Sequence, residues 1–180
     1  MIAEAAWQEF SLRKVFFIPS GDTPNKDMHH IDKNIRYAMV EKAIEGNGHF
    51  MISPIERDRQ GPSYTVDTIR ILQREFGDDY EFYFICGTDA VADLPTWKYN
   101  RELLSACHFI CASRPGNEIE IQKSIDYFGE LGREKIHFLK TPELAISSTI
   151  LRDWIAEKRS VRYLIPDAVI DMIRSNKLYE

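Results

Sequence analysis

The sequence contains few cysteines and no long apolar run. Its three cysteines, Cys86, Cys107 and Cys111, are too few for a disulfide scaffold and lack the spacing of a zinc site. All three lie in strand-like apolar segments, so we interpret them as small core residues. No apolar run of about 18 residues and no signal peptide is present, which predicts a soluble, cytoplasmic protein without membrane contact.

The chain also has no excess of basic residues and no linker. Its formal net charge is −5 at pH 7 and its pI is about 5.6, which argues against a general nucleic-acid-binding surface but leaves a local basic pocket open. No Pro-, Gly- or Ser-rich stretch interrupts the 180 residues, so we expect a single domain over residues 1–180. Composition does not decide the oligomeric state, and a homo-oligomer stays open.

Short apolar runs alternate with helical periodicity along the chain. Five runs rich in β-branched and aromatic residues read as buried strands, at residues 14–20, 49–56, 80–87, 107–113 and 135–140. Helical patterns cover about 2–10, 32–46, 64–76, 98–106, 118–128, 148–158 and 166–175, with Pro166 well placed as a first helical residue. This alternation predicts parallel βαβ units and therefore an α/β fold with a Rossmann-like, open, mostly parallel sheet.

Several well-known active-site motifs are missing. The sequence has no nucleophile elbow, no Walker loop and no GxGxxG. In open parallel sheets, ligands bind outside the carboxyl ends of the strands. The segments that follow the expected strands collect glycines, hydroxyl residues, basic residues and a tryptophan: IPSGDTPNKD, ERDRQGPSYT, ICGTDAVADLPTW, ASRPG and LKTPELAISST. Together they predict a nucleotide-sized site at one edge of the sheet.

The segment AISSTILRDWI (145–155) has the features of an unusual helix start. Ser147, Ser148 and Thr149 precede an apolar-periodic run, a pattern typical of an N-cap. Arg152 falls in the first turn, where the positive end of the helix dipole disfavours a cation. No Glu or Gln completes a capping box. An ordinary cap and an anion-binding helix start both fit this pattern.

A second expected helix start lies in GPSYTVDTIR (61–70). We expect Ser63 to cap the helix that starts near Tyr64, which leaves free N–H groups around Thr65. Such N–H groups can receive a carboxylate or a phosphate without any basic side chain. An ordinary serine cap after a Gly-Pro turn is the favoured alternative.

The segment CGTDAVADLPTWKYN (86–100) follows the third expected strand. Gly87 would let a ligand approach the backbone closely, and Asp89 could accept hydrogen bonds from ribose hydroxyls. Trp97 follows a proline in a loop, where its ring could stack on a planar ligand. A hydrophobic plug over the sheet edge is an equally good interpretation of Trp97.

Other polar residues carry weaker signals. Arg114, before a Pro-Gly turn, is more simply a solvated arginine. Lys26, His29 and His30 could face phosphates, and the adjacent histidines could suggest a metal. No partner at ligand spacing supports a metal site, so a surface loop is favoured. The remaining histidines are most simply structural: His49, His108 and His137.

Six stretches, taken in order, resemble the bacterial nicotinate-nucleotide adenylyltransferases of the nucleotidyltransferase superfamily. They are FIPSGDTPNK, GPSYTVDT, FICGTDAVADLPTW, RPG, ISSTILR and VRYLIPDAVIDMI, and the resemblance runs from Met1 to the C-terminus. It implies transfer of AMP from ATP to nicotinate mononucleotide with release of pyrophosphate and a need for Mg²⁺. A phosphopantetheine-type adenylyltransferase, a non-catalytic nucleotide-binding protein and a structural α/β module are the alternatives.

The resemblance also implies roles for individual residues. ATP phosphates would lie at Ser147, Ser148, Thr149 and Arg152, which would explain the arginine in the first turn. Gly87 and Asp89 would contact the adenosine ribose, and Arg114 would lie beside adenine. Trp97 would stack on the pyridine ring. The N–H groups of Thr65 and Lys98 would bind the nicotinate carboxylate, with Tyr64 also part of the mononucleotide site.

The sequence departs from this family in its first residues. Members begin with a strand, a GGTFDP-type loop and an HxGH motif, none of which occurs here, and Asn25 stands where members often carry His. Without that central strand, we expect its two neighbours to expose unpaired ladders. Our hypothesis is that Met1 is an internal methionine and that the true start lies about twenty residues upstream. The intact mass of the native protein, compared with 21.0 kDa, would test this.

Overall fold

A computed structural model describes residues 1–21, 31–113, 118–141 and 146–179. Within it, the chain divides into two compact units, each built from two chain segments. Unit 1 comprises Met1–Val15 and Ser63–Glu143, and unit 2 comprises Phe16–Pro62 and Leu144–Glu180. The single domain expected from composition stays a prediction.

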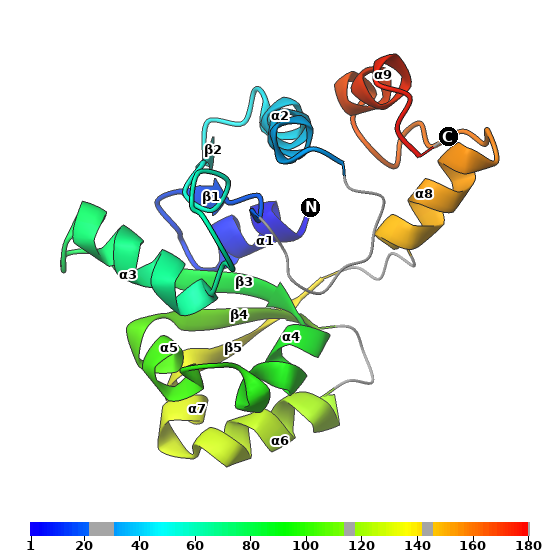
Figure 1. The fold of residues 1–180 in the computed structure, drawn as a ribbon. Coiled ribbons are helices and arrows are strands. Elements are labelled where there is room, and N and C mark those ends of the chain that lie inside the picture. The colour runs from blue at the N-terminus through cyan, green and yellow to red at the C-terminus, as the bar shows by residue number, and fades with distance from the viewer. Residues whose placement is uncertain (22–30, 114–117, 142–145, 180) are drawn as a thin grey trace. The chain divides into compact units, whose positions relative to one another are not determined.

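Unit 1 holds a three-stranded parallel sheet in the order β3-β4-β5 (Figure 1). Its elements are α1 (Ile2–Glu9), α3 (Thr65–Phe76), β3 (Tyr83–Gly87), α4 (Thr88–Asp93), the 3₁₀ helix η1 (Leu94–Thr96), α5 (Asn100–Ala106), β4 (His108–Ser113), α6 (Glu118–Phe128), α7 (Glu130–Lys135) and β5 (Ile136–Lys140). Because the strands are parallel, their carboxyl ends lie at one edge, at Gly87, Ser113 and Lys140.

The sheet of unit 1 is covered on both faces. Figure 1 shows α1 on one side and α4, α5, α6 and α7 on the other. Ala6 of α1 packs with Ile110 and Leu139, all three with no exposed surface. On β4, both Ile110 and its neighbour Cys111 are fully buried, although they point to opposite faces. A strand buried on both faces requires a continuous apolar run, which the sequence supplies.

The cysteines belong to this core, as the sequence predicts. Cys107 and Cys111 are buried, Cys86 is half-buried, and all three are free thiols. Burial raises the pKa of Cys86 and of Cys107 to about 12 and that of Cys111 to about 11. The thiols therefore stay protonated at neutral pH and act as small apolar side chains.

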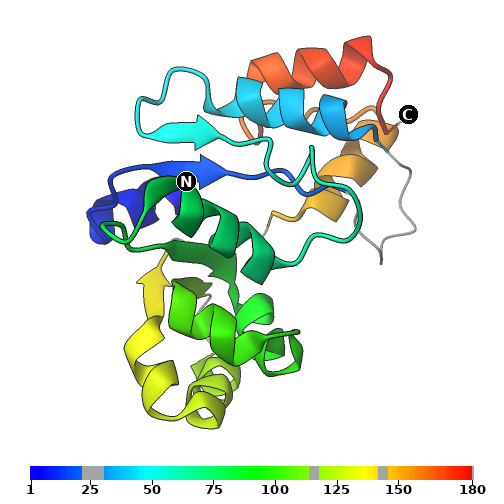
Figure 2. The same cartoon turned by 60° about the vertical axis from the view of Figure 1, so that its left-hand side comes forward.

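Unit 2 contains α2 (Lys33–Ile44), β2 (Phe50–Ile52), α8 (Ser148–Ala156) and α9 (Asp167–Ser175), while β1 (Val15–Phe17) runs from the end of the first segment of unit 1 into unit 2. Strands β1 and β2 form a two-stranded sheet. The rings of Phe17 and Phe50 meet edge to face, with centroids 5.0 Å apart. Helices α2 and α9 lie side by side (Figures 1 and 2).

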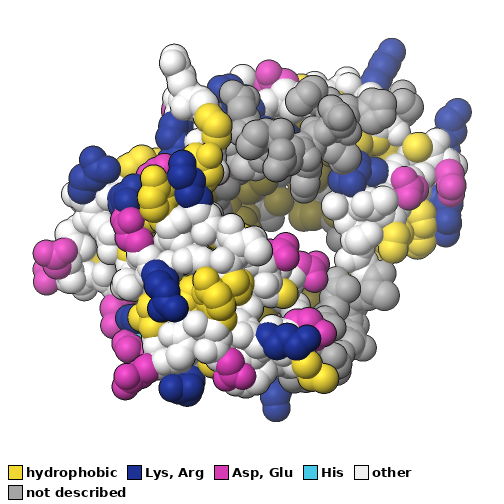
Figure 3. Space-filling view, turned by 60° about the horizontal axis from the view of Figure 1, so that its bottom comes forward, with side chains coloured by type: hydrophobic (Ala, Val, Ile, Leu, Met, Phe, Trp, Pro, Cys, Tyr) yellow, Lys and Arg dark blue, Asp and Glu magenta, His cyan; other side chains and the backbone are white. Residues whose placement is uncertain are grey.

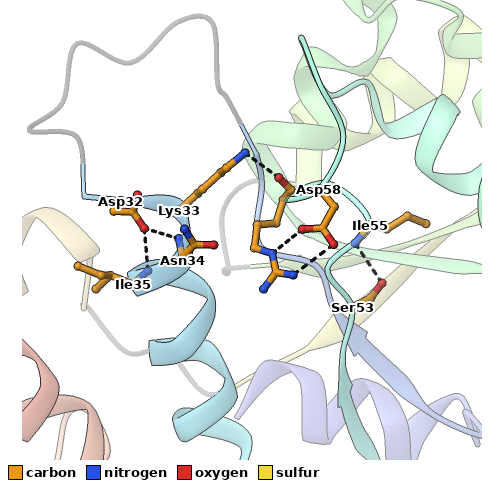
Figure 4. A network of polar contacts seen from close by, with 8 residues as sticks. Asp32, Lys33, Asn34, Ile35, Ser53, Ile55 and Asp58 are labelled. Carbon is orange, nitrogen blue, oxygen red and sulfur yellow. Dashed lines mark hydrogen bonds and ion pairs between the residues drawn. The ribbon is translucent and has the colours of Figure 1, made fainter.

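A polar network fixes the start of α2 (Figure 4). The Asp32 carboxylate accepts hydrogen bonds from the N–H groups of Asn34 (2.8 Å) and Ile35 (3.4 Å), a helix cap that lowers the pKa of Asp32. The Lys33 ammonium donates to the carbonyl of Arg57 at 2.9 Å. The loop after β2 is thereby tied to the first turn of α2.

All five expected strands and all seven expected helices are present, but the strands form two sheets instead of one. A single sheet would require a strand bonded to both β1 and β3. Among the described residues, β1 is paired only with β2 and β3 only with β4. The short helices α4 and α7 and the turn η1 were not expected. Pro166 is the N-cap of α9, not its first residue, because its backbone is extended (ψ 140°).

A chain of polar rings lies at the amino ends of the strands in unit 1. Tyr83 stacks on His108 (4.8 Å, 23°), and His108 stacks on His137 (5.1 Å, 18°). The Lys135 ammonium lies 3.1 Å from His108 Nε2, and His108 Nδ1 lies 2.8 Å from His137 Nε2. An ammonium only donates, so Nε2 of His108 accepts and its Nδ1 donates to His137. Both rings are therefore neutral.

Stability should fall in mild acid because of these two histidines. Burial lowers the pKa of both below the usual 6.5, and the Lys135 charge adds to this, with Glu81 and Glu134 opposing it at His108. The unfolded chain then binds more protons than the folded chain below about pH 6.5. We expect the free energy of unfolding to be highest above that pH and to decrease as the pH falls through the lowered pKa values. Urea unfolding between pH 7.5 and 5 measures this.

The double variant His108→Gln/His137→Gln should show a flatter pH dependence over that window. His49→Gln, which changes an exposed histidine outside the stack, serves as the matched control and should keep the wild-type dependence. Equal slopes for the wild type and the double variant would assign the acid sensitivity to other groups.

Candidate active site

The carboxyl end of β3 leads into a firmly held helix start. Gly87 is the N-cap of α4, with φ −87° and ψ 172°, and a Cβ atom placed on it would meet nothing within 4 Å. Asp89 is exposed in the first turn. The Ser124 hydroxyl donates to the Val91 carbonyl at 2.8 Å, and Val91 has no exposed surface. The accessible backbone of Gly87 and the Asp89 carboxylate thus lie at the start of a helix that is packed against α6.

Trp97 follows η1, and its indole is anchored to the sheet. The backbone N–H of Trp97 donates to the Leu94 carbonyl at 3.0 Å. The ring meets Phe84 edge to face (6.1 Å, 77°) and Phe109 likewise (6.5 Å, 63°). Phe84 and Phe109 are register partners on β3 and β4. Trp97 is half-buried, so part of its surface covers the sheet and part stays accessible.

Helix α3 begins without the serine cap expected from the sequence. The prediction for Ser63 is wrong: Tyr64 is the N-cap, and no side chain caps the helix. Tyr64 is extended (φ −99°, ψ 135°) and its carbonyl accepts from Asp67 and Thr68, so the helix starts at Thr65. The Ser63 hydroxyl is buried and has no hydrogen-bond partner among the described residues.

The missing cap leaves donors available at the start of α3. The N–H groups of the first helical residues, beginning at Thr65, have no acceptor within the helix. The Lys98 ammonium lies 4.9 Å from the centre of the Tyr64 ring, the ring of the N-cap residue. Backbone donors and a cation therefore gather at this helix start, an arrangement that favours an anion.

In unit 2, helix α8 begins with the serine cap that its sequence pattern predicts. Ser147 is the N-cap, and its hydroxyl accepts from the N–H of Ile150 at 3.1 Å. Ser148 is the first helical residue. The Arg152 guanidinium donates to the Thr149 hydroxyl at 3.2 Å, and the first turn contains no acidic residue. The cation is thus fixed beside the free N–H groups of the helix start.

Arg36 of α2 is a further basic residue of unit 2, and sequence reasoning missed it. Burial raises the pKa of Tyr179, and the positive charges of Arg152 and Arg36 act against that rise. Arg36 donates to the carbonyls of Ser20 (2.8 Å), Gly21 (3.0 Å) and Ile31 (3.4 Å). Its position in a helical pattern gave no signal, because these acceptors are backbone atoms outside the helix.

The predicted site residues fall into three groups. Unit 1 carries Tyr64, Thr65, Gly87, Asp89, Trp97 and Lys98, and unit 2 carries Ser147, Ser148, Thr149 and Arg152. Contacts join Tyr64 to Lys98 and Thr149 to Arg152. The remaining predicted residues lie outside the described residues: Arg114, Lys26, His29 and His30.

The described surface carries both positive and negative side chains, as a formal net charge of only −5 leads one to expect. On the face seen in Figure 3, basic and acidic side chains are interspersed.

In the described part of the chain, no three or more His, Cys, Asp or Glu residues are grouped as a metal site would need. No helix among the described residues is long and apolar enough to cross a membrane.

Comparison with known proteins identifies the family. The sequence model of the cytidylyltransferase-like family matches residues 1–153. A relative from Moorella thermoacetica, named probable nicotinate-nucleotide adenylyltransferase, is 44% identical over 179 residues, which cover 98% of this chain and 82% of the relative. The chain belongs to the nicotinate-nucleotide adenylyltransferase family. A further family member, from Thermoanaerobacter sp., is 41% identical over 180 residues, with 99% of this chain and 85% of the relative covered.

Solved structures of adenylyltransferases share the fold. The Plasmodium falciparum nicotinic acid mononucleotide adenylyltransferase in complex with APC has a TM-score of 0.75 at 18% identity, and the match covers 99% of this chain and 88% of that one. The same enzyme in complex with NaAD gives 0.74, with 99% and 90% covered. These matches confirm the predicted α/β fold of the nucleotidyltransferase type.

Proposed function

We infer that the chain catalyses the adenylyltransferase reaction of NAD biosynthesis, in which AMP passes from ATP to nicotinate mononucleotide. An oxygen of the mononucleotide phosphate attacks the α-phosphorus of ATP, the bond to the β-phosphate oxygen breaks, and deamido-NAD and pyrophosphate are formed. The observation that carries this inference is the 44% identity, over 98% of the chain, to the relative named probable nicotinate-nucleotide adenylyltransferase.

The residues of unit 1 suit the binding of the pyridine nucleotide and the adenosine ribose. We assign the pyridine ring to Trp97, whose indole is held by edge-to-face contacts with two phenylalanines. The N–H groups of Thr65 and Lys98 would bind the nicotinate carboxylate, beside the Tyr64 ring. Gly87 and Asp89 would contact the adenosine ribose, since the backbone at Gly87 is open. The position of Arg114 beside adenine stays a prediction, since this residue lies outside the described residues.

The residues of unit 2 suit the triphosphate. The N–H groups at Ser148 and Thr149 lack acceptors within the helix, and Ser147 orients the first turn. Arg152 adds a guanidinium that can bond phosphate oxygens in pairs. These groups would lower the free energy of the transition state by holding the phosphates in line for attack and by neutralising charge.

Mg²⁺ is part of this proposal as a companion of ATP. It is usually held by substrate phosphates and one or two carboxylates, not by an all-protein cage. We expect the ion to arrive with the triphosphate. When bound, it would reduce the negative charge of the phosphates.

Pyrophosphate release tests the proposed function. The 180-residue chain is given ATP, Mg²⁺ and nicotinate mononucleotide, and pyrophosphate and deamido-NAD are measured together. Formation of both in equal amounts is the expected result. Binding of ATP without either product would instead support a non-catalytic nucleotide-binding protein. Turnover with phosphopantetheine in place of the pyridine nucleotide would support the related adenylyltransferase.

Gly87→Ala tests the contact at the end of β3. The backbone is in an ordinary extended conformation and the Cβ position is empty, so the melting temperature should stay unchanged. A methyl group facing the ribose should raise the KM for ATP by about tenfold. Gly48→Ala, also with nothing within 4 Å but outside the predicted site, is the matched control. An unchanged KM for ATP would remove Gly87 from the site.

A further inference from the structure

The Lys98 ammonium is held between two tyrosine rings of unit 1. Its Nζ lies 4.9 Å from the centre of the Tyr64 ring and 5.2 Å from the centre of the Tyr99 ring. Tyr64 is the N-cap of α3 and Tyr99 is the N-cap of α5. Attraction to two rings restricts a side chain that otherwise has four rotatable bonds. The positive charge of Lys98 therefore has a defined position next to the first turn of α3.

The backbone at Tyr99 is strained in the conformation that supports this arrangement. Tyr99 has φ 58° and ψ 34°, the left-handed region, which is unfavourable for a bulky residue other than glycine. The same ring also lies under the Arg70 guanidinium, at 5.6 Å. Two cations thus share one ring, and the fold maintains the strained residue between them.

The nearby carboxylates are occupied by Arg70 and not by Lys98. Asp67 accepts from Arg70 at 2.8 Å, and Glu102 accepts from Arg70 Nε at 2.8 Å and also from its Nη2. Among the described residues, Lys98 forms no ion pair with any carboxylate. Within the described part of the chain, the exposed Lys98 ammonium contacts two ring faces and no carboxylate. It lies at a helix start where the backbone N–H groups already favour an anion.

We propose that the Lys98 side chain selects the carboxylate of nicotinate over the carboxamide of nicotinamide. This inference rests on the proposed function, in which backbone N–H groups at Thr65 and Lys98 bind that carboxylate. Backbone donors alone discriminate weakly, because a carboxamide oxygen also accepts a hydrogen bond. An ammonium group adds an attraction that only the anion experiences. Lys98 would thus be a specificity residue through its side chain, in addition to its backbone.

The test compares binding of nicotinate mononucleotide with binding of nicotinamide mononucleotide. Calorimetry gives the two dissociation constants for the wild type, Lys98→Met and Lys98→Arg. In Lys98→Met, the preference for the acid should fall about tenfold, since the attraction between one ammonium group and one carboxylate near a protein surface is lost. Lys98→Arg should keep most of it. Lys123→Met, which removes an exposed charge on α6, should leave both constants unchanged.

The tyrosine rings provide an independent arm of the test. Tyr99→Phe keeps the ring, and the preference should stay as in the wild type. Tyr99→Leu removes one ring face, so the preference should fall toward that of Lys98→Met. Raised ionic strength should weaken acid binding more in the wild type than in Lys98→Met.

The outcomes separate this inference from the proposed function. Wild-type protein that binds neither mononucleotide would contradict the proposed function itself. Wild-type protein that prefers the acid, with the same preference in Lys98→Met, would overturn the role of Lys98 while leaving the reaction intact. Equal weakening of both ligands in Lys98→Met would mean that Lys98 only supports the local structure, and it would overturn the inference as well.

Discussion

Trp97→Ala should weaken the binding of nicotinate mononucleotide by about tenfold to a hundredfold, because stacking on an aromatic side chain is worth roughly 1–3 kcal/mol per ring. Edge-to-face contacts with Phe84 and Phe109 hold the indole in place, so it loses little freedom when a ligand binds. The affinity for ATP should change much less. Calorimetric titration with each nucleotide separates the two effects.

Two further measurements distinguish stacking from packing at Trp97. Trp97→Phe keeps an aromatic face and should retain most of the affinity for the mononucleotide. Trp97→Ala should also lower the melting temperature, since the half-buried ring covers part of the sheet. A lowered melting temperature combined with wild-type affinity would show that Trp97 is only a plug over the sheet.

Gly132→Ala should have the largest effect on stability. Gly132 is buried in α7, and a Cβ atom there would lie 2.5 Å from the carbonyl oxygen and 3.0 Å from the Cα of Ile125 in α6. These are backbone atoms, so relief requires the two helices to separate. Overpacking of this kind costs about 3 kcal/mol, equivalent to a melting temperature lower by about 6–12 °C.

Differential scanning calorimetry measures this loss, and Gly48→Ala provides the control. A Cβ atom added to Gly48 would meet no atom within 4 Å, and its φ is not positive, so this substitution should leave the melting temperature within about 1 °C. A Gly132→Ala variant as stable as the wild type would mean that α6 and α7 can adjust their separation freely.

The fold was largely predictable because its strands are short, mostly apolar and flanked by clear helical periods. Helices α4 and α7 were not predicted, since each has six residues and less than two turns cannot display an amphipathic period. The cap of α3 was also missed. Whether Ser63 or Tyr64 caps depends on the backbone angles of both residues, and Gly-Pro-Ser-Tyr permits either register.

The candidate site was predictable where one chain segment determines it. The Ser147 cap and Arg152 come from one short segment, whose pattern fits both an ordinary cap and an anion-binding helix start. The contact of Lys98 with Tyr64 joins residues far apart in the sequence, and the left-handed backbone of Tyr99 has no signature in its residue type. The anchoring of Trp97 by two phenylalanines likewise depends on strand register.

The discontinuous composition of the two units sets an order for folding during synthesis. Unit 1 is complete in sequence once Glu143 has left the ribosome, whereas unit 2 requires the segment from Leu144 onward. Helix α2 contains no fully buried residue, and its neighbour α9 is translated last among the helices described. At about 5–20 residues per second, α2 waits on the order of ten seconds for that partner. Nascent chains stalled before α9 should therefore protect unit 1 from proteases while the α2 region remains cleavable.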